Sequence, residues 1–281
     1  MFFISYRKNF WSNTDDSDRD AIRDVPLDNL SEGQDVEEEK FMAKIKDKRL
    51  LLLIHGYRNK RENVVGGYAM IDNQLRAKNI LGTGARAYEE VIGIAWPGGL
   101  FRISYIIAKK RVNKIADSVF ARLQKIVAQA KAVDVMTHSL GARVILKAMQ
   151  NADPSKQLIR NLILTAPAVD DESIQEGEKF FGATQACRDV YVLYSDNDPV
   201  LSTFFKVPLL GDSDRALGER GPEKPNKVGQ NVHLVDCIHI VKEHSDYRKR
   251  LELYTFIKKV LDGQPITSPL SDDEGFVPGA G

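Results

Sequence analysis

The strongest candidate for chemistry in this sequence is Ser139, which lies in the run Thr137-His138-Ser139-Leu140-Gly141. An apolar run that predicts a strand precedes it, and a pattern that predicts a helix follows it. A serine on such a strand-to-helix turn, a nucleophile elbow, projects its hydroxyl above the edge of a sheet, where it can attack a carbonyl carbon. Thr137 stands where the motif usually has a small residue and crowds the turn. The alternative interpretation is a serine that caps a helix, but the context on both sides favours the nucleophile.

Apolar runs and helical periodicity alternate along the chain and define the elements that would position this turn. Residues 50–54, Leu-Leu-Leu-Leu-Ile, have the form of a strand buried on both faces of a parallel sheet. Further strands are expected at residues 91–96, 133–136, 162–165, 190–194 and 232–235, and helices at 62–78, 112–130, 141–150 and 247–261. This alternation implies an α/β protein with a mostly parallel central sheet and helices on both faces.

The two ends of the chain differ from this regular part. Residues 2–7 predict a first edge strand, and residues 12–39, which are acidic and weakly patterned, predict a surface loop before a helical turn at 41–45. Residues 264–281 are rich in Pro, Gly, Ser and Asp, which predicts a disordered C-terminal tail. We therefore expect a single domain over residues 1–263.

Charge and cysteine content exclude several classes of protein. The 40 Lys and Arg residues against 39 Asp and Glu residues leave a formal charge of +1, without the basic excess that nucleic-acid binding needs. Cys187 and Cys237 have no metal-ligand spacing and fit a reducing compartment. No apolar run approaches the roughly 18 residues of a membrane span, and the first residues do not form a secretory signal. We expect a cytoplasmic protein without metal or nucleic-acid partner.

A combination of motifs resembles the alpha/beta-hydrolase superfamily, and within it a bacterial group long filed as a domain of unknown function. The motifs are His55-Gly56-Tyr57, Trp96-Pro97-Gly98, the run around Ser139, Asp196-Asn197-Asp198-Pro199 and His244-Ser245-Asp246-Tyr247. The resemblance covers residues 3–261. It implies the alpha/beta-hydrolase fold, a serine nucleophile and hydrolysis of an ester-like bond. Because residues 166–189 are too few for a multi-helix cap, we expect a small or absent lid.

The superfamily places its acid after a strand that follows the nucleophile, and this position favours Asp198. It follows the predicted strand at 190–194 and precedes an apolar Pro-Val-Leu step. Asp196, two residues earlier, is the main rival and has the simpler interpretation of a turn cap. Asp170 and Asp171, after the preceding strand, are a third option, for which capping is again the simpler interpretation.

The base of the superfamily follows the last strand, which favours His244. His239, five residues earlier, lies among apolar residues and is expected to be a partly buried packing residue. His233 falls inside a strand pattern and is expected to be structural. His138 adjoins the nucleophile and is expected to pack beneath the elbow. A histidine base also predicts activity that rises with pH as the imidazole loses its proton.

The end of the first buried strand, His55-Gly56-Tyr57, occupies the place from which relatives direct a backbone N–H at the developing oxyanion. The resemblance therefore implies an oxyanion hole made by the backbone N–H groups of Tyr57 and Leu140. His55 is expected to hold this loop by hydrogen bonds. Trp96 either lines the site or covers the core.

The expected activity is that of a serine carboxylic-ester hydrolase, which works through an acyl-enzyme and a Ser139–His244–Asp198 triad without a cofactor. The expected partner is a small-molecule ester or acyl substrate. Alternatives are a thioesterase or amidase on the same triad, or a non-catalytic scaffold of the same fold that acts as an interaction protein. Residues 202–230 carry both basic and apolar side chains, which fits a solvated loop and, as the alternative, a site for an acidic substrate.

Overall fold

A nine-stranded sheet organises the part of the chain that the computed structural model describes, residues 1–28, 32–99, 105–204 and 215–271. The strand order is β3-β2-β1-β5-β4-β6-β7-β8-β9. All neighbouring pairs are parallel except β1 with β2 and β2 with β3. The strands are β1 (Phe2–Arg7), β2 (Asp16–Asp24), β3 (Gln34–Asp35), β4 (Arg49–Ile54), β5 (Glu90–Ala95), β6 (Ala132–His138), β7 (Ile159–Thr165), β8 (Cys187–Tyr194) and β9 (Val232–Asp236).

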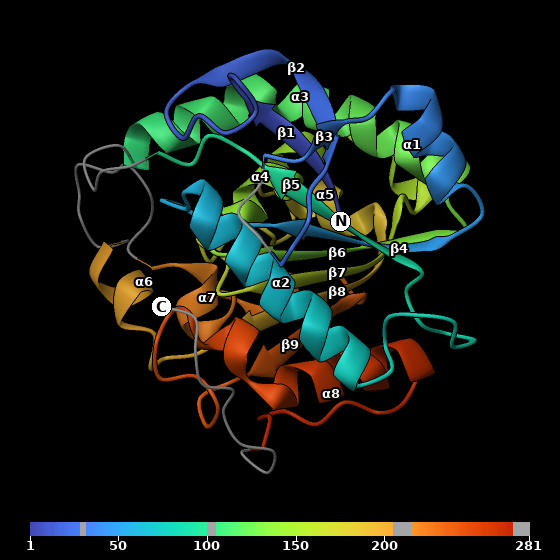
Figure 1. The fold of residues 1–281 in the computed structure, drawn as a ribbon. Helices are drawn as coiled ribbons and strands as arrows, with labels where there is room; N and C mark the ends of the chain where they lie inside the picture. Colours follow the sequence, from blue (N-terminus) through green and yellow to red (C-terminus); the bar gives the residue numbers. More distant parts are fainter. Residues whose placement is uncertain (29–31, 100–104, 205–214, 272–281) are drawn as a thin grey trace.

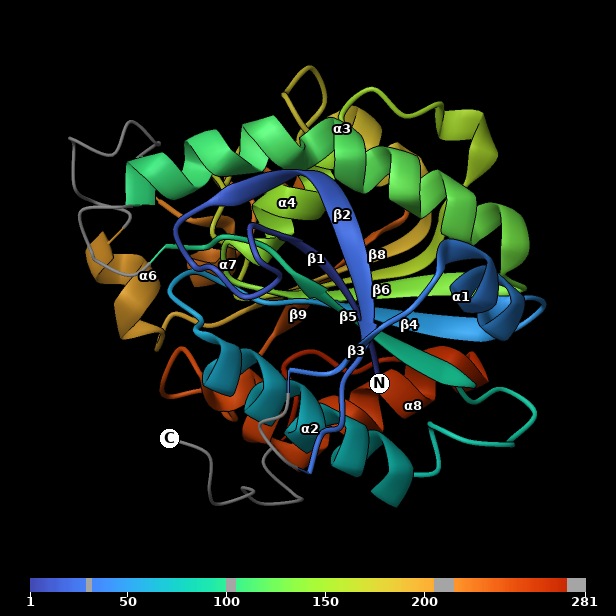
Figure 2. The same cartoon turned by 45° about the horizontal axis from the view of Figure 1, so that its top comes forward.

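Helices cover both faces of this sheet. In Figure 2, α2 (Arg61–Ala77) and α8 (Leu251–Asp262) lie below it, and α3 (Tyr105–Gln129) and α4 (Gly141–Ala148) lie above it. Helix α1 (Glu38–Ile45) contacts α3. The shorter helices are α5 (Phe181–Gln185), α6 (Pro199–Phe204) and α7 (Leu217–Arg220), with 3-10 turns η2 (Pro154–Lys156), η4 (Pro225–Lys227) and η5 (Asp246–Lys249). The layers seen in Figure 1 thus confirm the predicted mostly parallel sheet with helices on both faces.

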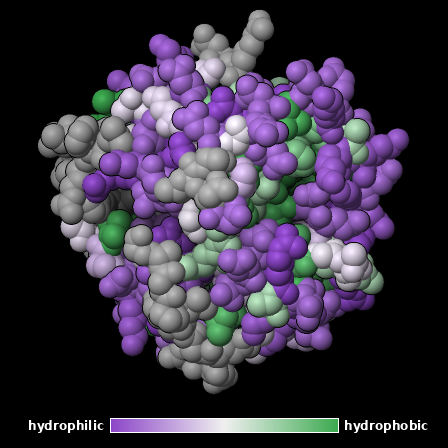
Figure 3. Space-filling model, viewed as in Figure 1, coloured by the Kyte–Doolittle hydropathy of each residue, from purple (hydrophilic) through white to green (hydrophobic). Residues whose placement is uncertain are grey.

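The apolar run at the centre of the sheet explains this arrangement. Every residue of β4 after Arg49 is buried, because β4 lies between β5 and β6 and helices cover both of its faces. Outside the core the surface is mostly polar: Figure 3 shows a hydrophilic face with apolar side chains in small separate groups. Ile106 and Ile107 are the large apolar side chains recorded as exposed in the described ranges. None of the described helices is long and apolar enough to span a membrane.

The N-terminal predictions need correction. β1 is an interior strand, antiparallel to β2 and parallel to β5, and not the expected edge strand. The expected surface loop at 12–39 contains β2, β3 and the start of α1. Its acidic, weakly patterned sequence concealed β2, because strands near a sheet edge carry charged residues that discourage pairing with other chains. Among the β2 residues whose burial is assigned, Ile22 is the one buried apolar side chain.

The C-terminal segment also differs from expectation over its first part. Leu270 is buried, and its N–H donates to the carbonyl oxygen of Asp236 at the end of β9. The hydroxyl of Ser268 accepts from the N–H of Asp236. Residues 264–271 therefore pack on β9 instead of forming a disordered tail, while residues 272–281 lie outside the described residues. The structure describes the expected loop at 202–230 except for residues 205–214. The described part contains α7 and η4.

The sheet topology brings four chain segments to one edge. The parallel strands β4 and β6 end immediately before His55 and Ser139. Strand β8 ends at Tyr194, shortly before Asp198, and β9 ends at Asp236, before the loop that carries His244. Because parallel strands present their carboxyl ends at the same edge, residues more than one hundred positions apart in sequence meet there.

Candidate active site

Ser139 occupies a strained turn between β6 and α4. Its φ angle is 54°, in the left-handed region that a residue with a side chain adopts at a cost of about 1–3 kcal/mol. Surrounding hydrogen bonds hold it there: its N–H donates to Thr165 O at 3.0 Å, and its carbonyl accepts from the N–H groups of Ala142 and Ala168 at 3.0 and 3.2 Å. The backbone therefore has the geometry of a nucleophile elbow.

Two glycines make room for this turn. A Cβ built on Gly141 would lie 2.5 Å from Ile54 O, and one built on Gly56 would lie 2.9 Å from the Cβ of Ser139. Both distances are shorter than real contacts, so α4 and the loop after β4 can approach the elbow only without those side chains. Thr137, where a small residue is usual, is 1% exposed and fits as the next-to-last residue of β6.

His244 and Asp198 are joined by a hydrogen bond of 2.7 Å between Nδ1 and Oδ2. The Asp198 side chain is fully buried, and its Oδ1 accepts from the N–H groups of Val200 and Leu201 at 3.0 and 3.2 Å. Burial raises the pKa of this carboxyl, but the hydrogen bond from His244, the charge of that ring and the N–H of Leu201 together hold the pKa below its ordinary value. Asp198 thus stays ionised beside the imidazole.

The rival acids are engaged elsewhere. Asp196 forms an exposed ion pair with Arg220 at 2.7 Å, and Asp171 pairs with Arg215 at 2.7 Å. Asp170 forms an isolated backbone bridge with Ala216. Of the acidic residues weighed from the sequence, the structure brings Asp198 to the histidine that was expected to be the base.

The rival histidines also have other surroundings. His239 is exposed, so the prediction of a partly buried packing residue is wrong; the apolar neighbours Ile240 and Val241 turn inward while His239 turns outward. His233 stacks on Tyr191 with ring centroids 4.8 Å apart and contacts Asp189 at 3.1 Å, which fits a structural role on the surface of β9.

His138 lies beneath the elbow, as expected, and also contacts the candidate base. Its Nε2 donates to the backbone carbonyl of His244 at 2.7 Å, and the two ring centroids are 4.6 Å apart. Burial, reinforced by the charge of His244, lowers the pKa of His138 to about 3. A neutral imidazole is therefore maintained next to the serine.

The loop after β4 is held by side chains at the ends of two other strands, β5 and β1. Trp96 is fully buried, stacks on His55 and donates from its indole to His55 O at 2.7 Å, so it covers the core and does not line an open site. Arg7, the last residue of β1, is 2% exposed and reaches the same loop. Sequence reasoning missed Arg7; the only signal was a cation at the end of a mostly apolar strand.

The segments that carry the two expected oxyanion donors adjoin Ser139, one in the sequence and the other in space. Leu140 follows Ser139 directly as the N-cap residue of α4, and in the described part of the structure its N–H has no acceptor. Tyr57 follows Gly56, whose Cα lies against the Ser139 side chain. The structure thus brings both backbone segments to the elbow.

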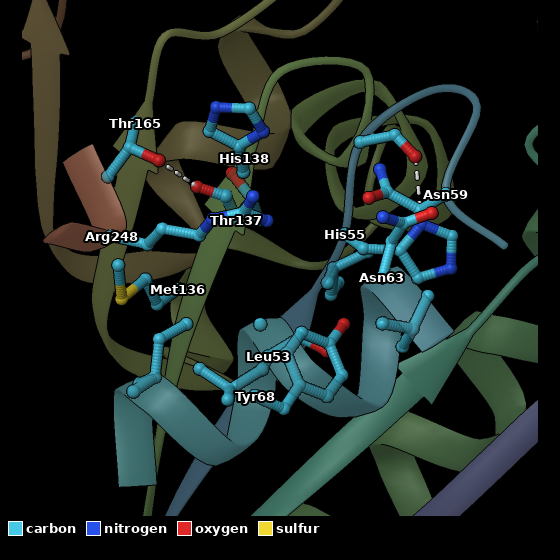
Figure 4. A pocket seen from close by; sticks show the side chains of 15 residues that line it. Leu53, His55, Asn59, Asn63, Tyr68, Met136, Thr137, His138, Thr165 and Arg248 are labelled. Carbon is cyan, nitrogen blue, oxygen red and sulfur yellow. Dashed lines mark hydrogen bonds between the residues drawn. The ribbon is translucent and has the colours of Figure 1, made fainter. Parts of the chain in front are cut away.

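A small pocket lies under the elbow, between α2 and the sheet (Figure 4). Gly56, Thr137 and His138 form the wall next to the serine, and Arg248 enters from η5. Its volume of about 40 Å³ admits a few water molecules but not an acyl chain. Its lining is mostly apolar, with side chains from β4, β6 and α2, and it lies in the support of the elbow. In the described ranges, no group of three or more His, Cys, Asp or Glu side chains could hold a metal ion.

With this fold and this site, the protein is an alpha/beta hydrolase. The chain belongs to a family described as alpha/beta hydrolases of unknown function, which it matches over residues 32–254. No curated protein matches it.

Solved structures with a similar fold include three enzymes. Aspergillus fumigatus lipase B is 13% identical over 77% of this chain, with a TM-score of 0.43, and the chain spans only 52% of its length. The Bordetella parapertussis LpqC, a poly(3-hydroxybutyrate) depolymerase, is 11% identical over 79% of this chain and 83% of its own, with a TM-score of 0.44. The metagenomic carboxylesterase EstE1 is 12% identical over 80% and 83%, with a TM-score of 0.43.

Proposed function

We propose that this hydrolase cleaves carboxylic esters with Ser139 as nucleophile, His244 as general base and Asp198 as the acid that orients the base. The observation that carries the proposal is the 2.7 Å hydrogen bond between His244 and the buried Asp198. It lies at the sheet edge where Ser139 adopts the left-handed turn of an elbow. A buried, ionised carboxylate at this distance fixes the tautomer of the imidazole and stabilises its charged form.

The first half of the reaction forms an acyl-enzyme. Asp198 keeps the proton of neutral His244 on Nδ1, so that Nε2 is free to accept the proton of Ser139 as the serine oxygen attacks the ester carbonyl. The negative charge that develops on the carbonyl oxygen is stabilised by the N–H groups of Tyr57 and Leu140. The imidazolium then gives its proton to the departing alkoxide, and the alcohol leaves.

The second half repeats these steps with water. His244 takes a proton from a water molecule, which attacks the acyl carbon of Ser139, and the tetrahedral oxyanion forms at the same two donors. The proton returns to the serine oxygen as the carboxylic acid leaves. The sequence of steps needs no cofactor.

The proposal includes one hydrolase domain over residues 1–263 and a small-molecule ester as substrate. It also includes a cytoplasmic location, which is supported by two buried, unpaired thiols, Cys187 and Cys237. A thioester or amide would meet the same nucleophile, and chromogenic esters compared with acyl thioesters and anilides of matched chain length distinguish these substrates.

Labelling with a fluorophosphonate tests the proposal without knowledge of the substrate. We expect one label per wild-type chain and none in Ser139→Ala. Ser155→Ala, which changes an exposed serine next to Asp153, is the matched control and should label like the wild type. Labelling of Ser139→Ala at the wild-type rate, or no labelling of a folded wild type, would overturn the proposal and favour a non-catalytic scaffold.

A further inference from the structure

Arg7 is a buried cation that is held by neutral acceptors. Its guanidinium donates to Trp96 O at 2.8 Å, Asn13 Oδ1 at 2.6 Å, Asn59 O at 2.9 Å and His55 Nε2 at 3.0 Å. In the described ranges no carboxylate pairs with it. Burial lowers its pKa to about 10, which leaves the group charged at neutral pH. A buried charge without a counter-charge is costly. The burial of the Arg7 guanidinium therefore indicates that this residue has a role other than stability.

The contacts of Arg7 determine which nitrogen of His55 carries the proton. Nε2 of His55 faces two groups that can only donate, the Arg7 guanidinium at 3.0 Å and the Trp96 backbone N–H at 3.2 Å. Nε2 must therefore be the acceptor, and the proton must lie on Nδ1. Burial and the charge of Arg7 also hold the pKa of His55 well below its ordinary value, so the ring stays neutral.

The Nδ1 proton of His55 in turn fixes a peptide group. Nδ1 lies 2.8 Å from Gly56 O, and a carbonyl oxygen can only accept. The carbonyl of Gly56 and the N–H of Tyr57 belong to the same planar trans peptide, so they point in opposite directions. When His55 holds the oxygen on one side, the Tyr57 N–H is directed to the other.

The far side of the loop is held in the same way. The Asn59 side chain donates to Tyr57 O at 3.0 Å, and Arg7 holds Asn59 O. The N–H of Arg58, which has a left-handed φ of 59°, donates to Gly98 O at 3.3 Å. Arg7 thus contacts both ends of the five-residue segment 55–59, which contains Tyr57.

We propose that Arg7 is a positioning residue for the oxyanion hole: by selecting the Nδ1–H tautomer of His55, it orients the Gly56–Tyr57 peptide so that the Tyr57 N–H serves as an oxyanion donor. This inference rests on the proposed function of Ser139. Arg7 acts through hydrogen-bond geometry, so a lysine, which has the charge without the planar fork, does not replace it.

The wild-type protein supplies the first test. Nitrogen-15 NMR of the protein labelled at histidine distinguishes the two neutral tautomers, and we expect His55 to carry its proton on Nδ1 between pH 6 and 8. A His55 protonated on Nε2, or a charged His55, would overturn the proposal whether or not the enzyme activity is known.

Kinetics of Arg7→Met and Arg7→Lys supply the second test. A misplaced oxyanion donor costs on the order of 100-fold in rate, and we expect a loss of that size in kcat and in the rate of fluorophosphonate labelling, with KM unchanged. Arg122→Met is the matched control, because Arg122 of α3 is also buried but pairs with Asp20 of β2 and Glu38 of α1.

The outcomes separate this proposal from the proposed function. If Ser139 is labelled in the wild type but folded Arg7→Met is labelled equally fast, the role of Arg7 is wrong and the nucleophile stands. If wild-type Ser139 is not labelled at all, the proposed function fails, and the tautomer of His55 is still decided by NMR. Recovery of full activity in Arg7→Lys would mean that charge, not geometry, is what Arg7 contributes.

Discussion

His138 and His244 are joined by a hydrogen bond of 2.7 Å from Nε2 of His138 to the backbone carbonyl oxygen of His244. The residue that precedes the proposed nucleophile thus holds the main chain of the proposed base. Because the pKa of His138 is lowered to about 3, its ring remains neutral throughout the physiological range. The side chain of His244 is fixed by Asp198 and its backbone by His138, so the imidazole is anchored at two points.

The first prediction concerns His138. His138→Phe keeps a ring of similar shape but removes the donor, and we expect kcat to fall by about 10- to 100-fold because the base is less well oriented, with little change in KM. His138→Gln places an amide N–H near the position of Nε2 and should recover most of the activity. Steady-state kinetics on a chromogenic ester measure both. A folded His138→Phe with wild-type kcat would show that the hydrogen bond has no part in orienting His244.

The second prediction distinguishes Asp198 from Asp196. Asp198→Asn places an amide that can donate beside Nδ1 of His244, which favours the tautomer with its proton on Nε2, and that tautomer cannot accept the serine proton. We expect turnover to fall by about 10⁴-fold. Asp196→Asn, which loses an exposed ion pair with Arg220, should keep near-wild-type turnover. The reverse result, with Asp196→Asn inactive and Asp198→Asn active, would reassign the acid.

The sequence predicted the sheet well where burial imposes a pattern. The five apolar residues at 50–54 lie in β4, and the helical periodicity at 112–130 lies in α3, which begins earlier, at Tyr105. The sequence did not predict β2, which lies near the sheet edge. Among its residues with assigned burial, Ile22 is the one buried apolar side chain. Periodicity reports burial, so an element that buries little leaves little signal.

The residues of the candidate site were likewise predicted only in part. The elbow around Ser139 follows from local order, strand then serine then helix. The triad order of the superfamily, applied to the predicted strands, led to Asp198 and His244. The contact of Arg7 with His55 and that of His138 with His244 could not be predicted, because each joins residues 48 or more positions apart that meet only in the folded sheet. The outward orientation of the His239 side chain could also not be predicted from the apolar residues beside it in the sequence.

The third prediction concerns stability in acid. His138 and His55 are both held neutral in the folded protein, because burial lowers their pKa values, whereas in the unfolded chain each takes up a proton below about pH 6.5. The unfolded state then binds more protons than the folded state, so the free energy of unfolding falls as the pH falls. Each histidine contributes a slope of about 1.4 kcal/mol per pH unit in this range.

Urea unfolding at pH 7.5, 6.0 and 5.0 measures this slope. The contribution of His138 ends near its folded pKa of about 3. His138→Gln should be less sensitive to acid than the wild type, and His233→Gln, which changes an exposed ring, should not differ from it. An unfolding free energy that is constant from pH 7.5 to 5.0 would contradict the neutral state of these buried rings.

The fourth prediction concerns a carboxylate that supports the fold away from the site. Asp134, fully buried near the start of β6, accepts hydrogen bonds from Tyr88 Oη, from Nε and Nη2 of Arg160 and from the backbone and side chain of Asn161, at 2.8 to 3.0 Å. Asp134→Ala leaves these donors and the Arg160 charge without their partner. We expect the free energy of unfolding to fall by about 3–5 kcal/mol.

Asp35→Ala is the control for this change, since Asp35 pairs with Arg23 on the surface with its side chain 80% exposed, and such pairs contribute at most about 1 kcal/mol. Below its lowered unfolding temperature, Asp134→Ala should still be labelled by a fluorophosphonate at the wild-type rate, because Asp134 lies four residues before the end of its strand and contacts none of the proposed catalytic side chains. A loss of labelling in the folded variant, with stability unchanged, would place Asp134 in the catalytic apparatus instead of the framework.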